Sequence, residues 1–96
     1  MSAAEAEELE KIESEITDLG RQMIAKRDRA IDILFGRIGT TRSGKKFRIN
    51  RADLYFGGGD VRMFFRGPVL KKNGLAHARA EESATIRTFE KIERAS

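Results

Sequence analysis

A proline-free stretch occupies residues 3–37, more than a third of this 96-residue chain. Ala, Glu, Leu, Ile, Lys and Arg predominate there, and most of these residues favour helix. Small and apolar residues recur at alternating spacings of three and four, as in the a and d positions of a coiled coil, with one polar break. The stretch predicts a long helix, assigned to residues 1–38, with a narrow apolar seam. The seam positions are Leu9, Ile12, Ile16, Leu19, Met23, Lys26, Ala30 and Ile33.

The two halves of this expected helix differ in their apolar surface. A second apolar stripe starts only halfway along, so the C-terminal half has a wide face that a sheet can cover. Residues 5–24 have the narrow seam alone, which needs another helix to cover it. We therefore predict that this segment extends past the globular body and forms a homodimer. The dimerisation residues are Leu9, Ile12, Ile16, Leu19 and Met23.

Charge predicts the orientation of that dimer. With Leu9 at position a, Glu8 and Arg29 both occupy g positions. A parallel pair would set Glu8 against Glu13 of the second copy, whereas an antiparallel pair lets Glu8 reach Arg29. The sequence therefore favours an antiparallel homodimer. The alternative is that the seam packs within one chain, on Ile86, Phe89 and Ile92.

Residues 45–80 alternate between apolar and polar positions, as half-buried strands do. Strands are expected over residues 45–50, 52–56 and 61–66, with a glycine-rich turn between the last two. Asn73 and Gly74 are a two-residue hairpin signal between two further short segments. Because strands joined by short turns run antiparallel, we predict a three- to four-stranded antiparallel β-meander.

The C-terminal residues return to a helical spacing. Ile86, Phe89 and Ile92 recur at intervals of three, which predicts a C-terminal helix over residues 81–94. The length of the chain suits one domain, since typical domains contain about 100–150 residues. The expected fold class is α+β: a single domain over residues 1–96, with both helices on one face of the meander.

Charge is distributed unevenly along the chain. Residues 1–20 hold seven acidic residues and one basic residue, whereas residues 37–72 hold ten basic residues against Asp53 and Asp60. A basic segment next to an acidic one indicates a localised surface for an anionic partner. The expected partner is nucleic acid or an acidic protein surface.

The expected strands place basic residues and aromatic rings on one side of the sheet. If Phe47, Ile49, Leu54, Phe56, Val61, Met63 and Phe65 face the helices, the opposite face has aromatic rings interleaved with cations. Such a face suits single-stranded nucleic acid, because bases stack on rings while cations contact phosphates. The alternative is that the C-terminal helix or a partner subunit covers the rings. The candidate binding residues are Arg42, Lys45, Lys46, Arg48, Tyr55, Arg62, Phe64, Arg66, Lys71 and Lys72.

The sequence has few residues that could form a catalytic or metal site. The chain has no cysteine and one histidine, His77, which excludes thiolate metal sites, cysteine nucleophiles and sites that need two histidines. Residues 39–45 match GxxxxGK, but Lys46 follows where a P-loop has Ser or Thr, and the expected strand comes after the loop instead of before it. The loop can still offer N–H groups and basic side chains to an isolated phosphate. We expect no catalytic residues, no metal and no cofactor.

The sequence also bears on location. No apolar run approaches the roughly 20 residues of a membrane span, and a chain without cysteine suits a reducing cytoplasm. We therefore predict a cytoplasmic, non-enzymatic protein that binds DNA or RNA largely without sequence specificity.

Two other functions remain open. One is a protein-interaction module, an inhibitor or adaptor of mobile-element or phage origin, that docks its basic patch on an acidic surface of a nucleic-acid-processing protein. A structural assembly protein is the third possibility.

Overall fold

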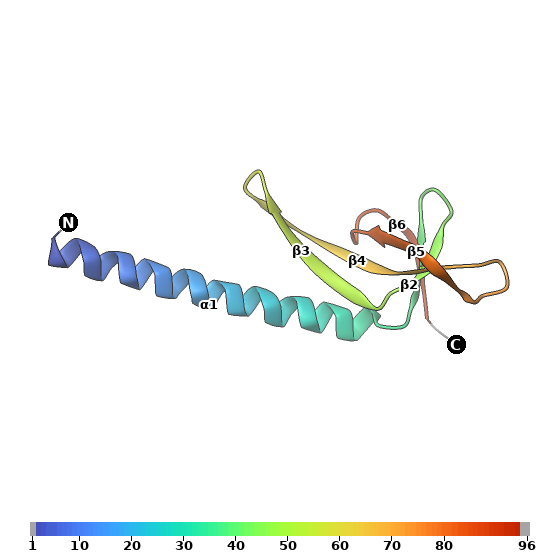
Figure 1. The fold of residues 1–96 in the computed structure, drawn as a ribbon, viewed down its shortest axis with the longest axis horizontal. Coiled ribbons are helices and arrows are strands. Elements are labelled where there is room, and N and C mark those ends of the chain that lie inside the picture. Colours follow the sequence, from blue (N-terminus) through green and yellow to red (C-terminus); the bar gives the residue numbers. More distant parts are fainter. Residues whose placement is uncertain (1, 95–96) are drawn as a thin grey trace.

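Helix α1 (Ala3–Leu34) forms the N-terminal third of the chain in the computed structural model, which describes residues 2–94 (Figure 1). Ser2 caps it: the Ser2 hydroxyl accepts a hydrogen bond from the backbone N–H of Glu5 at 3.2 Å. The helix continues through Gly20, so the prediction of one long helix is confirmed. It ends four residues before the predicted residue 38, because the Gly36 N–H bonds across to the carbonyl of Ile49 at 2.7 Å.

Within the described residues, six strands follow the helix, and every strand pair is antiparallel. The strand order is β3-β4-β2-β1-β6, with β5 also paired to β4. Phe65 pairs with Ala52 of β3 and with Ala84 of β5, so these two strands lie on opposite edges of β4. The strands are β1 (Ile38–Thr41), β2 (Lys46–Arg48), β3 (Arg51–Gly57), β4 (Asp60–Leu70), β5 (Ala76–Ala84) and β6 (Phe89–Glu93).

The sheet is larger than predicted. An antiparallel arrangement is confirmed, but the predicted meander is wrong, because β4 pairs with β2 and β1 pairs with β6. Within residues 2–94 there are six strands instead of three or four, and they span residues 38–93 instead of 45–80. The hairpin at Asn73 and Gly74 is present, with a three-residue loop: the Gly74 N–H donates to the Lys71 carbonyl at 2.9 Å and the Lys71 N–H to the Leu75 carbonyl at 2.8 Å. Gly74 has φ of 84°, which suits the left-handed position that closes such a loop.

The predicted C-terminal helix over residues 81–94 is wrong. These residues complete β5, turn at residues 85–88 and return as β6, which pairs with β1. The Thr85 N–H donates to the Thr88 hydroxyl at 2.9 Å, and the Thr88 N–H donates to the Thr85 carbonyl at 2.9 Å. Ile86 therefore lies exposed in a turn, while Phe89 and Ile92 pack against the core from a strand. Three apolar residues at a spacing of three were too few to specify a helix, and pairing with β1 decided the outcome.

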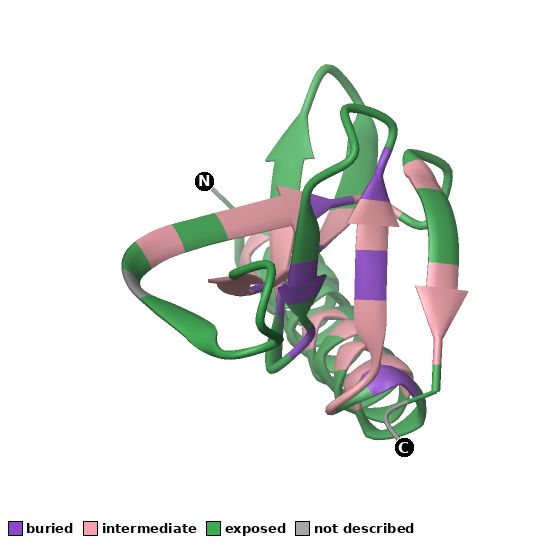
Figure 2. Ribbon diagram, turned by 90° about the vertical axis from the view of Figure 1, so that its right-hand side faces the viewer, coloured by how far each residue is buried: buried purple, intermediate pink, exposed green. Residues whose placement is uncertain are grey.

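The core lies between the last turns of α1 and the bent sheet. Phe47 and Phe65 are almost completely buried, and the Phe47 ring stacks on that of Phe89 with centroids 5.5 Å apart. Figure 2 shows the buried residues gathered in the sheet and at the end of α1. The buried apolar set is Leu34, Phe47, Ile49, Ala52, Phe65 and Ala84, with Ala30, Ile31, Met63, Phe89 and Ile92 packed against it.

The N-terminal half of α1 projects away from this core, so that the molecule measures 65 × 25 × 23 Å (Figure 1). The alternative in which the seam packs within the chain is wrong, because Phe89 and Ile92 pack with core residues, and the seam residues of this half are exposed. Leu9, Ile12, Ile16 and Leu19 are 44–63% exposed.

Candidate nucleic-acid interface

The register of the strands places six of the candidate residues on the outer side of the sheet. Phe47 and Phe65 point into the core, so their strand neighbours point outward. Tyr55 pairs with Arg62, and Asp53 with Phe64, which sets these four side chains side by side. The outward candidates are Lys46, Arg48, Tyr55, Arg62, Phe64 and Arg66.

Arg66 is engaged within the chain. Its Nε lies 2.9 Å from a carboxylate oxygen of Asp53, and its Nη2 donates to the Tyr55 hydroxyl at 2.7 Å. Arg51 also pairs with Asp53 and with Glu81, at 3.7 and 2.8 Å. Two arginines and two carboxylates thus neutralise each other here, and Arg66 has less charge to offer a ligand than its position in the sequence indicated.

The two aromatic candidates contact each other. The Tyr55 and Phe64 rings meet edge to face, with centroids 5.2 Å apart and planes at 87°. The Arg66 guanidinium lies 5.7 Å from the Tyr55 centroid and covers part of one ring face. The C-terminal helix that was expected as an alternative cover does not form, and Tyr55 remains 47% exposed.

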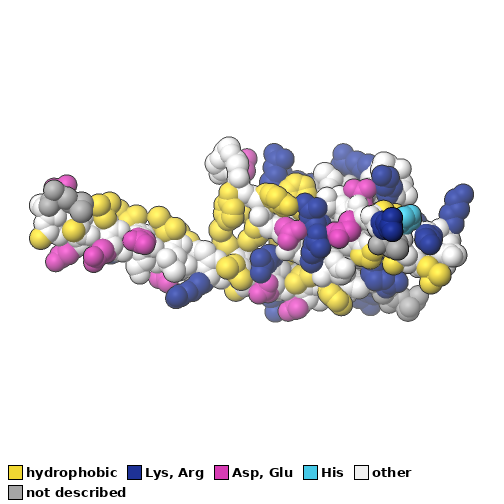
Figure 3. Space-filling model, in the orientation of Figure 1, with side chains coloured by type: hydrophobic (Ala, Val, Ile, Leu, Met, Phe, Trp, Pro, Cys, Tyr) yellow, Lys and Arg dark blue, Asp and Glu magenta, His cyan; other side chains and the backbone are white. Residues whose placement is uncertain are grey.

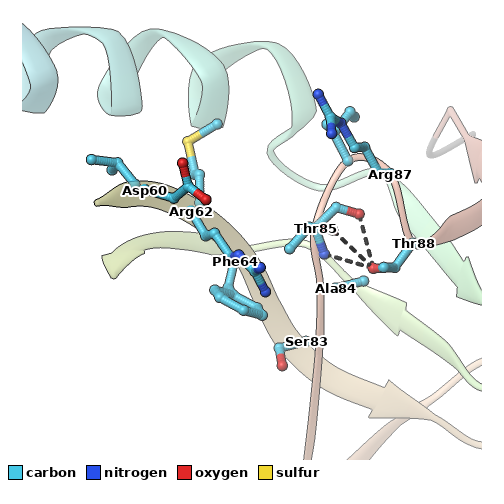
Figure 4. A pocket seen from close by; sticks show the side chains of 11 residues that line it. Asp60, Arg62, Phe64, Ser83, Ala84, Thr85, Arg87 and Thr88 are labelled. Carbon is cyan, nitrogen blue, oxygen red and sulfur yellow. Dashed lines mark hydrogen bonds between the residues drawn. The ribbon is translucent and has the colours of Figure 1, made fainter. Parts of the chain in front are cut away.

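Phe64 lines a groove beside the first half of β4 (Figure 4). Strand β5 pairs with β4 only from Phe65 onward, so among the described residues the edge of β4 over residues 60–64 has a strand on one side alone. The segment of residues 83–88 forms the opposite wall, and the groove has a volume of about 640 Å³. The shape follows from the turn after β5, which carries the chain away from β4.

The groove combines cations, hydroxyls and one aromatic ring. Arg62 and Phe64 contribute from β4, and Arg87 contributes from the opposite wall (Figure 4). Arg42, in the β1–β2 loop, lies outside the groove lining, and its guanidinium donates to the Arg87 carbonyl at 3.2 Å. Within residues 2–94, no carboxylate lies within 4 Å of these three guanidinium groups. Asp60 supplies one acidic side chain, and the hydroxyl-bearing residues are Ser83, Thr85 and Thr88.

The lysines and Arg48 lie outside the groove lining. Lys45 is 3.6 Å from a Glu82 carboxylate oxygen, and the Arg48 guanidinium donates to the Gly36 carbonyl at 3.3 Å. Lys71 and Lys72 are exposed in the loop that follows the C-terminal end of β4. The groove lies at the N-terminal end of that strand, about 30 Å away. The ten candidates are therefore not one cluster.

Lys46 faces β6 across β1, because Lys46 and Lys91 both pair with Thr40. Lys91 lies 2.9 Å from Glu93. A hydrogen bond from Lys91, its charge and that of Lys46 lower the pKa of Glu93. The charges of two lysines thus stabilise the ionised form of this carboxylate.

Arg87 and the three hydroxyl-bearing residues of the groove were missed by sequence reasoning. They lie in the segment that was expected to be helical, where Arg87 reads as an ordinary solvent-facing residue. The available signal was the cluster Ser-Ala-Thr-Ile-Arg-Thr, because Ser and Thr favour turns over helix interiors.

The phosphate-loop resemblance is explained by a hairpin. The Thr41 N–H donates to the Lys45 carbonyl, and the Gly44 N–H donates to the Thr41 carbonyl, both at 2.9 Å. The Lys45 N–H donates to the Thr41 hydroxyl at 3.2 Å. These three N–H groups therefore form hydrogen bonds within the loop.

The described part of the chain has no group of three or more His, Asp or Glu side chains placed to hold a metal ion. His77 is exposed, and its Nδ1 accepts a hydrogen bond from the Arg79 N–H at 3.3 Å. No helix within residues 2–94 is both long and apolar enough to cross a membrane. Comparison of the chain with protein families, curated proteins and solved structures gives no match.

Proposed function

We propose that this protein is a non-enzymatic nucleic-acid-binding protein that takes a single strand along the groove beside β4. The observation that carries the proposal is the joint presence of Arg62, Phe64 and Arg87 in one open groove. Cations of this kind contact phosphates, and a base that stacks on an aromatic ring contributes about 1–3 kcal/mol. The proposed compartment is the cytoplasm, whose reducing conditions suit a chain without cysteine.

The rest of the sheet region supports the same partner. Residues 36–94 carry fourteen basic and six acidic residues, and this excess attracts a polyanion at long range. Among the described residues, the groove lining has no Asn or Gln and thus no amide that reads adenine. The binding is therefore proposed to depend on backbone and stacking contacts, with little preference for sequence.

Fluorescence anisotropy with labelled 20-nucleotide single-stranded DNA, single-stranded RNA and duplex DNA over a salt series tests this function. The double variant Arg62→Ala/Arg87→Ala should bind single strands more weakly and lower the slope of log affinity against log salt by about 1.4. Phe64→Leu should cost single-strand affinity more than duplex affinity, because it removes a stacking surface.

The matched control is Lys71→Ala/Lys72→Ala, which removes two charges at the far end of β4 and should have a smaller effect. Equal losses in the two double variants would overturn the groove as the binding site. If wild-type protein binds none of the three nucleic acids at 50 mM salt, the nucleic-acid function is wrong and the basic surface would serve an acidic protein partner.

We also propose that the protein is a homodimer through α1. The support is the exposed seam of Leu9, Ile12, Ile16 and Leu19, which repeats at coiled-coil spacing. Sedimentation analysis at high micromolar concentration should return twice the mass of the chain, and a monomeric mass would contradict the dimer.

A further inference from the structure

A second groove lies between α1 and β3. Met23 and Ile24 line it from the helix, and Leu54 and Phe56 line it from the strand. Ile24 is 48% exposed and Phe56 is 66% exposed, which is unusual for side chains that face one another across a domain. The apolar surface here is therefore open to a further apolar element.

The groove exists because the β3–β4 hairpin leaves the core and rises away from the helix (Figure 1). Phe56 pairs with Val61 near the tip of the hairpin, and Val61 is also 49% exposed. Figure 3 shows hydrophobic side chains where the hairpin meets the helix and, on the same upper side, along the free half of α1. The apolar seam and the open groove thus face the same side of the molecule.

We propose that this groove receives the N-terminal half of α1 from a second copy of the chain, running antiparallel. This inference rests on the proposed self-association and adds where the second helix lies. By two-fold symmetry, each copy inserts residues 5–19 into the corner between α1 and the hairpin of the other copy. In such a dimer, the exposed seam in the N-terminal half of each α1 and the exposed groove of the other copy cover one another.

Charge complementarity selects this occupant. Residues 3–19 carry seven acidic residues and one basic residue, whereas residues 20–29 carry four basic residues and one acidic residue. The antiparallel overlap sets the acidic half of one helix against the basic half of the other. A parallel overlap would set acidic halves together, which is repulsive.

The heptad pattern sets the register. In an antiparallel pair each a position faces a d position of the other helix. With Glu8 opposite Arg29, Ile12 of one copy then faces Met23 of the other, and Ile16 faces Leu19. Met23 belongs to both the seam and the groove lining, so a helix in this register lies directly beside Ile24 and Phe56.

Disulfide trapping tests the register, because the chain has no cysteine of its own. Under mild oxidation the double variant Ile12→Cys/Met23→Cys should form a covalent dimer on a non-reducing gel. The single variant Ile12→Cys should remain monomeric on the same gel. Self-linking of the single variant would overturn the antiparallel register while leaving the proposed self-association in place.

The variant Phe56→Asp tests the groove. Phe56 is exposed, so the variant should keep the wild-type circular dichroism spectrum. Its dimer dissociation constant, measured by sedimentation, should rise roughly tenfold or more. Leu75→Asp is the matched control, because Leu75 is 65% exposed and lies in the β4–β5 loop, and it should dissociate like wild type. A dimer as tight with Phe56→Asp as with wild type would overturn the groove alone, whereas a wild-type monomer would overturn both the groove and the homodimer.

Discussion

The N-terminal half of α1 that projects from the core, here called the free helix, and the sheet region differ in how much of their apolar surface is buried. The sheet buries Phe47, Ile49 and Phe65 within one chain, whereas the helix leaves Ile16 and Leu19 about 60% exposed. Their charges are also opposite, with acidic residues in excess on the free helix and basic residues in excess on the sheet. The sheet region therefore buries its central apolar residues within one chain, although Phe56 near the hairpin tip stays exposed, and the N-terminal half of α1 leaves its apolar seam exposed.

Hydrogen bonding explains how one chain holds both regions. An α-helix satisfies its backbone groups locally, so α1 can project from the core without partners for those groups. Strands need neighbours, and here β1 obtains one on each side, from β2 and β6. Truncating a buried apolar side chain of the sheet should therefore lower the free energy of unfolding strongly. Truncating an exposed apolar side chain in the N-terminal half of α1 should change it little.

The largest expected effect is in the core. Phe65→Ala removes an almost fully buried ring and should lower the free energy of unfolding by about 3–5 kcal/mol. Ile16→Ala should change it by less than about 0.5 kcal/mol at concentrations where the chain is monomeric. Urea titrations followed by circular dichroism measure both. A similar cost at the two positions would contradict the contrast.

Two glycines should respond with opposite signs. A Cβ at Gly67 would overlap the backbone carbonyl of Arg48, so Gly67→Ala should destabilise the protein by about 1–3 kcal/mol. Gly20 lies in α1 with nothing within 4 Å of an added Cβ, and Gly20→Ala should stabilise the helix by about 1 kcal/mol. Thermal unfolding of the two variants gives the comparison, with wild type as the reference.

Removing the free half of the helix should separate its role from that of the sheet. A chain without residues 3–19 keeps every core residue, so it should fold and should lose self-association. It also loses seven acidic residues and one basic residue, so its affinity for single-stranded nucleic acid should stay the same or rise. Anisotropy and sedimentation on the truncated chain check the two outcomes, and lost nucleic-acid binding would place the interface on the helix instead.

The smallest expected effect is a titration on β6. Lys91 and Lys46 lower the pKa of Glu93, so this carboxylate contributes stability above the usual glutamate pKa that is lost as the pH falls through the lowered value. Replacing Lys91 by Ala should raise the pKa of Glu93 towards its usual range. An NMR titration of the Glu93 carboxyl measures the change, and Lys71→Ala is the control that should leave it unaltered.

The candidate site could be predicted from the sequence in part. Alternation along β3 and β4 was enough to set Tyr55, Arg62, Phe64 and Arg66 on the outer side of the sheet. It could not tell that Asp53 pairs with Arg66, because that contact depends on the register between the two strands. It also could not bring Arg87 to the edge of β4, since that depends on the turn after β5.

Local patterns determined the elements that are stabilised locally. The propensities and heptad spacing of α1 act over neighbouring residues, as do the glycine-containing turns at residues 57–60 and 73–74, and these elements were predicted from the sequence. Tertiary structure decided what depends on distant partners. Phe89 and Ile92 form a strand and not a helix because β1 offered an open edge on which they could pair while packing their side chains against the core, where the Phe89 ring contacts Phe47 and Phe65.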